Sequence, residues 1–168
     1  MTRPTRLHHA AAVVKDLKRT HDFYTNIIGL PLVATWCEEL EDGQSYCHVF
    51  FELEDGSALA LFQFAEPAMY EANKRPDNLS PFQHVAFAAS AKCQKEIEER
   101  AIDNGLKISY MDHGYCRSLY LTDPDNHMVE VTTDHDDASD GSEARKRTAK
   151  SELDRWLAGD HTINNHAR

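Results

Sequence analysis

The chain has 168 residues, of which 41% are hydrophobic, and this size suits one domain with a substantial apolar core. Its formal net charge of -10 argues against a nucleic-acid partner, which would require a basic face. No apolar run approaches the roughly 18 residues of a membrane span, and the start of the chain lacks the apolar stretch of a signal peptide, so we expect no membrane partner and a cytoplasmic location.

The first half of the chain begins with an apolar run at residues 7–14, which predicts a strand. Asp16 is a good helix N-cap, and apolar residues then recur with helical spacing until Gly29, which suits a left-handed helix end. Three short strands are predicted after this helix, at residues 31–35, 46–53 and 58–64. The first half therefore reads as strand, helix and three strands.

The second half repeats this order. A strand that begins at His84 leads to Ser90, and the helix that follows closes at Asn104 and Gly105. Three more strands are predicted, at residues 107–111, 117–122 and 128–132. The polar segment 66–81 contains three prolines, which predicts a surface linker between the two halves.

The pattern stops after residue 133. The acidic residues 134–142 predict a solvated linker, and residues 143–157 predict a helix. Trp156 lies on the apolar side of that helix, and an indole ring has little reason to remain in water. We therefore expect the tail to pack on the body or on a second subunit.

The two halves align residue by residue, and the alignment places His9 opposite His84 and Ala60 opposite Glu130. On a strand that contains His84, the residues on the same face are alanines, which leave room around the imidazole. Glu130 stands in an apolar strand, where a lone ionised carboxylate is costly unless it is paired or binds a metal ion.

Two imidazoles and one carboxylate on a rigid sheet are typical of a non-haem Fe(II) site, although Mn(II), Zn(II), Co(II) and Ni(II) accept similar donors. A single histidine is more often an ordinary polar residue than a metal ligand. The occurrence of histidine at the same offset in both halves, together with a buried glutamate, favours ligation by His9, His84 and Glu130.

Three motifs carry a resemblance to a known family: His9-x5-Lys-Asp-Leu, Phe23-Tyr-x4-Gly-Leu and Asp123-Pro-Asp-Asn-x3-Glu130. Over residues 6–133 the chain resembles the vicinal oxygen chelate superfamily, which contains glyoxalases, extradiol dioxygenases, epimerases and antibiotic-resistance proteins. The resemblance implies that His9, His84 and Glu130 are metal ligands. It also implies that Ala60 stands where glyoxalases I supply a further glutamate, which favours the branches with three ligands.

The same resemblance implies an α+β fold with two tandem βαβββ modules that form one cupped, mostly antiparallel eight-stranded sheet, followed by a C-terminal helical tail. Residues 1–133 would then form one domain. Its parts would be module one (6–65), the linker (66–81) and module two (82–133), with an acidic linker and C-terminal helix at 134–168.

A finer resemblance covers residues 113–130, which are similar to the signature of type I extradiol ring-cleaving dioxygenases. It implies that His113 is a general acid/base and Tyr120 a hydrogen-bond donor; the simpler interpretations are a histidine of a surface turn and a tyrosine of a core strand. The sequence departs from the signature at Met111 and Asn126. It also has Ser57 at the place where these dioxygenases carry a further histidine.

These observations predict an Fe(II)-dependent dioxygenase of aromatic catabolism that cleaves the ring of a catechol-type substrate with dioxygen. Two alternatives remain: a metal-dependent isomerase, lyase, epimerase or thiol transferase acting on another vicinal-oxygen chelator, and a resistance protein that sequesters its ligand. We interpret His48 as a wall-lining or structural residue, not as a ligand. We expect a homo-oligomer, because the family often builds dimers and Trp156 offers a contact.

Overall fold

The computed structural model describes residues 2–76, 80–135 and 138–164. Three parts of the predicted segments lie outside the described residues: 77–79 of the linker, 136–137 of the acidic segment and 165–168 of the tail.

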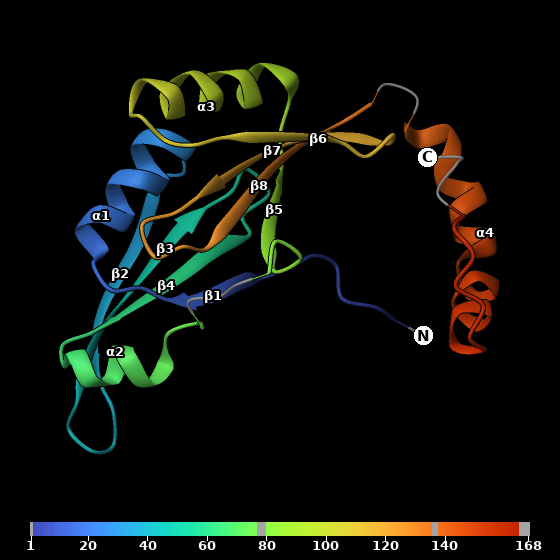
Figure 1. The fold of residues 1–168 in the computed structure, drawn as a ribbon. Helices are drawn as coiled ribbons and strands as arrows, with labels where there is room; N and C mark the ends of the chain where they lie inside the picture. Colours follow the sequence, from blue (N-terminus) through green and yellow to red (C-terminus); the bar gives the residue numbers. More distant parts are fainter. Residues whose placement is uncertain (1, 77–79, 136–137, 165–168) are drawn as a thin grey trace.

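The first module has the predicted order of strand, helix and three strands (Figure 1). The carboxylate of Asp16 accepts hydrogen bonds from the first-turn backbone N–H groups of Lys18 and Arg19, and Gly29 ends the helical segment with φ of 94°. The second part of this helix has π geometry, which the apolar spacing did not predict. The elements are β1 (His9–Val13), α1 (Leu17–His21), η1 (Asp22–Ile28), β2 (Leu32–Glu39), β3 (Ser45–Glu52) and β4 (Ala58–Phe64).

The second module repeats the order of the first. The hydroxyl of Ser90 accepts a hydrogen bond from the backbone N–H of Cys93 at 3.1 Å and so caps the second helix, as predicted. The elements are β5 (His84–Ala88), α3 (Ala91–Asp103), β6 (Ser109–Asp112), β7 (Cys116–Thr122) and β8 (Met128–Asp134). The prediction of two βαβββ modules is therefore confirmed.

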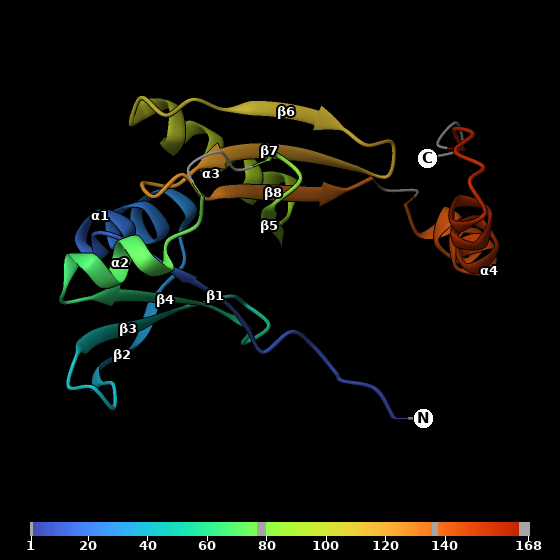
Figure 2. The same cartoon turned by 60° about the horizontal axis from the view of Figure 1, so that its bottom comes forward.

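The prediction of one continuous eight-stranded sheet is wrong for this chain. Within the described residues the strands form two four-stranded sheets, in the orders β1-β4-β3-β2 and β5-β8-β7-β6. Each sheet has one parallel pair, and its other pairs are antiparallel. Figure 2 shows the two sheets as separate layers. They stay separate because β1 and β5 each form their ladder with the last strand of their own module.

One apolar core joins the two modules. It contains Phe23 and Ile27 from η1, Phe51 and Leu61 from the first sheet, and residues of α3 and the second sheet. Burial of these side chains from both modules is the main stabilising contribution to the fold. Since one face of each sheet contributes to this core, the opposite face remains available for chemistry.

Polar contacts fix the docking of the modules. Arg100 of α3 donates a hydrogen bond to the carbonyl of Ile27 at 2.8 Å, close to the end of η1. The buried hydroxyl of Tyr24 donates to Asp123 in the turn between β7 and β8 at 3.1 Å. Both contacts join module one to module two, so the orientation of the two sheets is set by the helices and this turn.

Two helices lie outside the modules. The segment predicted as a linker contains α2 (Pro67–Asn73), which begins with the proline at a position that suits it. The C-terminal helix α4 (Ala138–Leu157) starts five residues before the prediction, so part of the predicted solvated linker is helical. In Figures 1 and 2, α4 stands apart from the sheets. Of the described helices, none has the length and apolar character that a membrane crossing requires.

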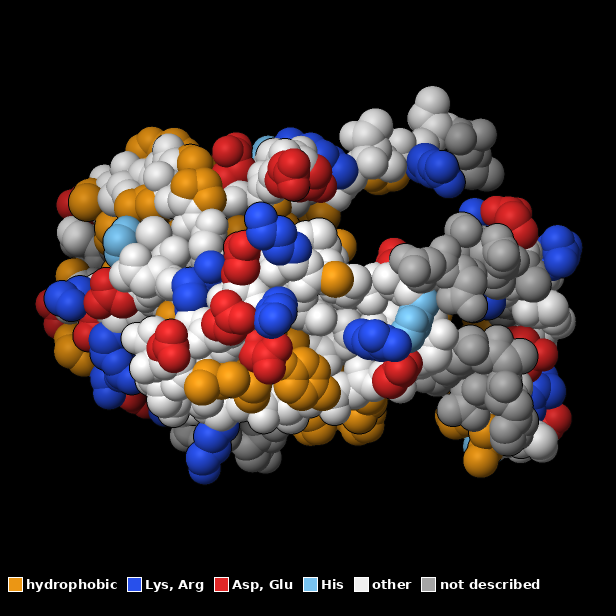
Figure 3. All heavy atoms as spheres, turned by 90° about the horizontal axis from the view of Figure 1, so that it is seen from above, with side chains coloured by type: hydrophobic (Ala, Val, Ile, Leu, Met, Phe, Trp, Pro, Cys, Tyr) orange, Lys and Arg blue, Asp and Glu red, His pale blue; other side chains and the backbone are white. Residues whose placement is uncertain are grey.

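The surface above α3 carries charges of both signs (Figure 3). Lys92 lies 3.8 Å from Glu96 and Lys95 lies 3.9 Å from Glu99 along the exposed side of this helix. Such exposed pairs contribute little to stability. Charges of both signs therefore lie side by side along this helix.

Candidate metal centre

Strand register confirms the internal alignment of the two modules. In the first sheet Ala11 pairs with Ala60, and in the second sheet Ala86 pairs with Glu130. Ala60 and Glu130 therefore occupy the same place in the two sheets. The first residues of β1 and β5 are the two histidines that the sequence aligned.

The second sheet brings His84 and Glu130 together. Nε2 of His84 lies 2.8 Å from Oε2 of Glu130, and only 6% of Glu130 is exposed. Nδ1 of His84 lies 2.9 Å from the carbonyl oxygen of Pro81, which can only accept a hydrogen bond. This contact places a proton on Nδ1 and turns Nε2, the nitrogen that would bind a metal ion, toward the carboxylate.

A hydroxyl group supports the carboxylate from β7. Ser118 is fully buried and donates a hydrogen bond from Oγ to Oε1 of Glu130. The sequence motifs did not identify this residue. The signal was available in the strand alternation, because Ser118 lies two residues before Tyr120 and therefore on the same face of the sheet.

His113 and Tyr120 form a pair beside the carboxylate. Nε2 of His113 is 2.9 Å from the hydroxyl of Tyr120 and 3.9 Å from Oε1 of Glu130. Burial, and secondly the charge of Glu130, raises the pKa of the Tyr120 phenol above its usual value. The phenol therefore remains protonated at neutral pH and can donate a hydrogen bond.

The structure does not bring His9 to this pair. His9 lies on β1, in the other sheet, where its Nδ1 is 2.8 Å from Nδ1 of His8 and its ring meets the edge of Phe50 at 5.9 Å between centroids. Among the described residues, no three His, Cys, Asp or Glu side chains form a group that could hold one metal ion. His84 and Glu130 thus form two thirds of the predicted ligand set.

The face of the first sheet beside His9 is aromatic. His48 stacks on Phe62 with 3.9 Å between ring centroids, and Trp36 and Phe50 pack around it. Nδ1 of His48 is 3.5 Å from Glu38, while its buried Nε2 has no hydrogen-bond partner among the described residues. His48 therefore belongs to the aromatic face beside His9, with the ring of Phe50 in contact with both histidines.

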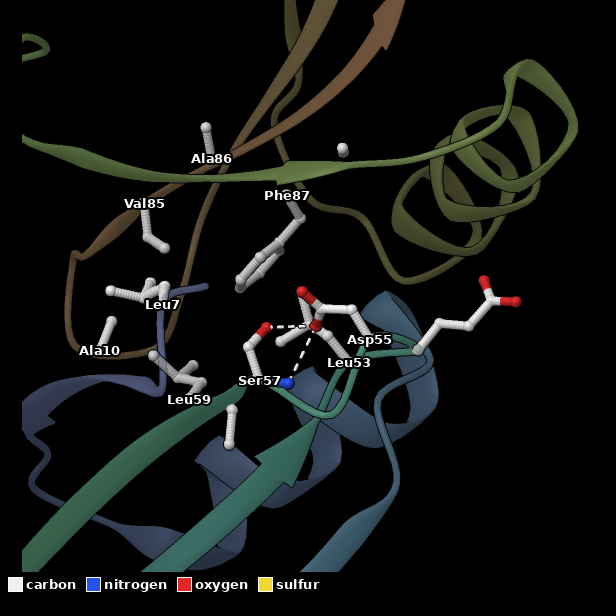
Figure 4. Close-up of a pocket in the computed structure, with 12 residues that line it drawn as sticks. Leu7, Ala10, Leu53, Asp55, Ser57, Leu59, Val85, Ala86 and Phe87 are labelled. Atoms are coloured by element: carbon white, nitrogen blue, oxygen red, sulfur yellow. Dashed lines mark hydrogen bonds between the residues drawn. The ribbon is translucent and has the colours of Figure 1, made fainter. Parts of the chain in front are cut away.

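Ser57 takes part in a turn and not in the metal centre. Its backbone N–H donates to Oδ1 of Asp55 at 2.9 Å, and its hydroxyl donates to the same oxygen (Figure 4). These contacts lower the pKa of Asp55. The turn borders a cavity of about 540 Å³ between the modules, lined by Leu59, Val85 and Phe87 among others. Neither His84 nor Glu130 lines this cavity, so the cavity and the candidate metal centre are separate places.

The donor set suits a divalent transition metal. His84 and Glu130 offer one imidazole nitrogen and one carboxylate oxygen, Oε2, at close range. Ser118 and the His113–Tyr120 pair lie on the side of the other carboxylate oxygen, Oε1, and leave Oε2 free. Nitrogen and oxygen donors of this kind bind Fe(II), Mn(II), Zn(II), Co(II) and Ni(II). A third donor is needed to complete the arrangement that the sequence predicts.

The chain is similar in sequence to known proteins. Catechol-2,3-dioxygenase of Bacillus subtilis is 26% identical over 134 residues, which are 77% of this chain and 42% of that protein. The chain thus spans less than half the length of this relative. Glutathione transferase FosA of Serratia marcescens is 25% identical over 125 residues, which are 74% of this chain and 78% of FosA.

The fold has solved counterparts as well. The fosfomycin resistance protein FosX of Listeria monocytogenes, in a complex with Mn(II) and 1S,2S-dihydroxypropylphosphonic acid, superposes with a TM-score of 0.56 at 22% identity. The match covers 77% of this chain and 92% of FosX and shows a shared fold. The family model of the Glyoxalase/Bleomycin resistance protein/Dioxygenase superfamily matches residues 6–131. The chain belongs to this superfamily.

Proposed function

We propose that the protein is a metal-dependent enzyme, with Fe(II) as the favoured ion, that cleaves the ring of a catechol-type substrate with dioxygen. The observation that carries the proposal is the cluster around Glu130, in which His84 meets one carboxylate oxygen and the His113–Tyr120 pair lies beside the other. This cluster combines metal donors with a proton-handling pair at one place.

The chain's own residues divide the chemistry. A bound divalent ion supplies positive charge, which favours ionisation of a coordinated hydroxyl group. Tyr120 donates a hydrogen bond to a substrate oxygen, and His113 accepts a proton from the substrate and returns it to the product oxygen. Insertion of both atoms of dioxygen beside the diol would open the ring and give a semialdehyde acid.

The faces that carry the predicted ligands favour a neutral aromatic substrate. The eight described strands contain one cationic residue, Arg117, and strand alternation turns it away from the face of Ser118 and Tyr120. The face of the first sheet instead presents Trp36, Phe50 and other rings. Aromatic rings stack on such a surface, whereas a phosphonate would call for Arg or Lys.

We infer that a second copy of the chain supplies His9. Within one chain the modules dock through their helices and inner faces, so His9 and the His84–Glu130 pair stay apart. A C2 dimer repeats each contact twice, and it could bring β1 of each copy to β5 and β8 of the other. Exposed apolar residues occur on both sheets, with Val33 and Trp36 on the first and Tyr110 and Met111 on the second.

A second candidate function is a metal-dependent thiol transferase, isomerase or lyase that uses the same donors. The observation that favours it is coverage: the chain spans 78% of FosA but 42% of the dioxygenase. In such an enzyme the ion would stabilise an oxyanion, and dioxygen would not be consumed. Dioxygen therefore separates the two candidates.

The test is to load the purified chain with Fe(II) without oxygen and then supply a panel of catechols with an oxygen electrode. We expect one dioxygen consumed for each ring opened. Glu130→Ala should lose iron and activity, because the two remaining imidazoles hold the ion poorly without the carboxylate. The control Asp112→Asn removes an exposed carboxylate from the same sheet and should keep both.

Two results would contradict the proposal. Iron-loaded protein that consumes no dioxygen with any catechol would favour the second candidate, which can be assayed with glutathione and fosfomycin. Full iron content in the Glu130→Ala variant would remove the ligand assignment itself.

A further inference from the structure

The two carboxylate oxygens of Glu130 have different partners. Oε2 lies 2.8 Å from Nε2 of His84, the nitrogen available to a metal ion. Oε1 points the other way, accepts a hydrogen bond from Ser118 and lies 3.9 Å from His113. One oxygen is therefore directed at the metal centre, and the other is held by the protein.

Ser118 has one hydrogen and gives it to Glu130. Its Oγ also lies 3.3 Å from Oγ1 of Thr132, but a hydroxyl has one hydrogen to give. The carboxylate can only accept, and a bond to a charged acceptor is the stronger one, so the hydrogen goes to Glu130. Ser118 is fully buried, and water therefore does not compete for this bond.

The position is specific to the module that carries the carboxylate. Ser118 pairs with Thr132 and Tyr120 with Glu130, just as His48 pairs with Phe62 and Phe50 with Ala60 in the first module. The first module, which has alanine in place of the glutamate, thus has no serine at the matching position. The serine hydroxyl is therefore present in the module that has a carboxylate to accept its hydrogen bond.

We propose that Ser118 is a positioning residue that reserves Oε1 of Glu130 and so keeps this carboxylate a one-oxygen ligand of the metal ion. The inference rests on the proposed metal centre. Two imidazoles and one carboxylate oxygen leave about three positions open, and a second carboxylate oxygen would take one of them. A substrate that chelates through two oxygens, together with dioxygen, needs all three.

Mn(II) provides the test, because the relaxation of water protons reports how many exchangeable waters the ion holds. Metal-free full-length protein is loaded with Mn(II) alone. We expect about three waters in the natural chain and about two in Ser118→Ala, so the inner-sphere relaxation falls by about one third. Ser118→Thr restores the hydroxyl and should restore the water count.

The matched control is Thr132→Val, which removes a hydroxyl from the same cluster without removing the donor to Glu130, and it should keep the count of the natural chain. Ser118→Cys has a weak donor and should behave like the alanine variant, which covers the case in which the latter does not fold. An unchanged water count in both Ser118→Ala and Ser118→Cys, or an equal loss in Thr132→Val, would overturn the inference.

The outcome is independent of the ring-opening assay. A protein that holds Mn(II) but opens no catechol would refute the proposed reaction, and the relaxation result would still decide the role of Ser118. A natural chain that binds no Mn(II) would refute the metal centre and this inference with it.

Discussion

At the scale of single residues, the environment of His113 decides what it can do. Its Nε2 is bonded to the hydroxyl of Tyr120 at 2.9 Å and stands 3.9 Å from Glu130, which is too long for a direct hydrogen bond to the carboxylate. The imidazole is therefore close to the metal donors without competing with them. This geometry suits proton transfer to a bound substrate.

We predict that His113→Gln keeps the metal ion and loses ring opening by about 10²- to 10⁴-fold in kcat, the usual effect of a lost general acid or base. Metal content by elemental analysis and turnover by oxygen consumption check this. Tyr120→Phe should also keep the metal, with a smaller loss. If His113→Gln turned over at the natural rate, or lost its metal, the role in proton transfer would be wrong.

At the scale of elements, the turn between β7 and β8 holds the second module against the helix of the first. Oδ1 of Asp123 accepts hydrogen bonds from the backbone N–H groups of Asp125 and His127, each at 2.8 Å. Its Oδ2 accepts a hydrogen bond from the hydroxyl of Tyr24. The motif Asp-Pro-Asp-Asn thus shapes the turn before β8. It also positions the strand that carries Glu130.

We predict that Tyr24→Phe lowers the free energy of unfolding by about 1–3 kcal/mol, because it leaves buried Asp123 without one of its donors. Denaturant titration at equal protein concentration measures this. The control is Tyr46→Phe, because the hydroxyl of Tyr46 donates to the exposed carboxylate of Glu38. This variant should change the free energy of unfolding by less than about 0.5 kcal/mol. Equal stability of Tyr24→Phe and the natural chain would refute the contribution of this contact.

The same variant has an expected pH signature. Burial, and secondly the charge of Asp123, raises the pKa of the Tyr24 phenol well above its ordinary value of 10.0. The folded state thus favours the protonated phenol. The contribution of Tyr24 to the free energy of unfolding is therefore fully present below pH 10 and is lost as the pH rises from 10 through the raised pKa of the folded state. Phenylalanine does not ionise, and Tyr24→Phe should lose stability less steeply in alkali.

At the scale of the whole molecule, His9 lies in one sheet and His84 and Glu130 lie in the other. This separation allows a test of whether a second copy of the chain supplies His9. If one copy gives His9 and the other gives His84 and Glu130, His9→Ala and Glu130→Ala are defective in different halves of the site. A mixed dimer then contains one intact site and one doubly defective site. Refolding the two variants together should restore metal binding that neither has alone.

With equal amounts, half of the dimers are mixed, so we expect about a quarter of the natural metal content per chain. Elemental analysis of the refolded mixture, against each variant refolded separately, gives the value. A mixture that holds no more metal than its separate components would show that the ligands come from one chain or that His9 is not a ligand.

The sequence by itself determined much of this architecture. The spacing of apolar residues, Asp16, Ser90 and Gly29 set the helix boundaries, because caps and periodicity are local properties. The internal repeat also aligned Ala60 with Glu130, since equal strand order gives equal register. The π-helical η1 was not predicted, because backbone winding depends on packing. The early start of α4 was not predicted, because helix ends are the least well marked part of a helix in the sequence.

Only the tertiary structure decided how the predicted site residues relate in space. His84 and Glu130 meet because β5 and β8 are neighbours in one sheet, and Ser118 joins them from β7. His9 stays apart because the modules dock through their helices and the inner faces of their sheets, and not through a shared strand ladder. Contacts between elements distant along the chain follow from the packing of whole apolar faces, and local spacing carries no record of which faces meet.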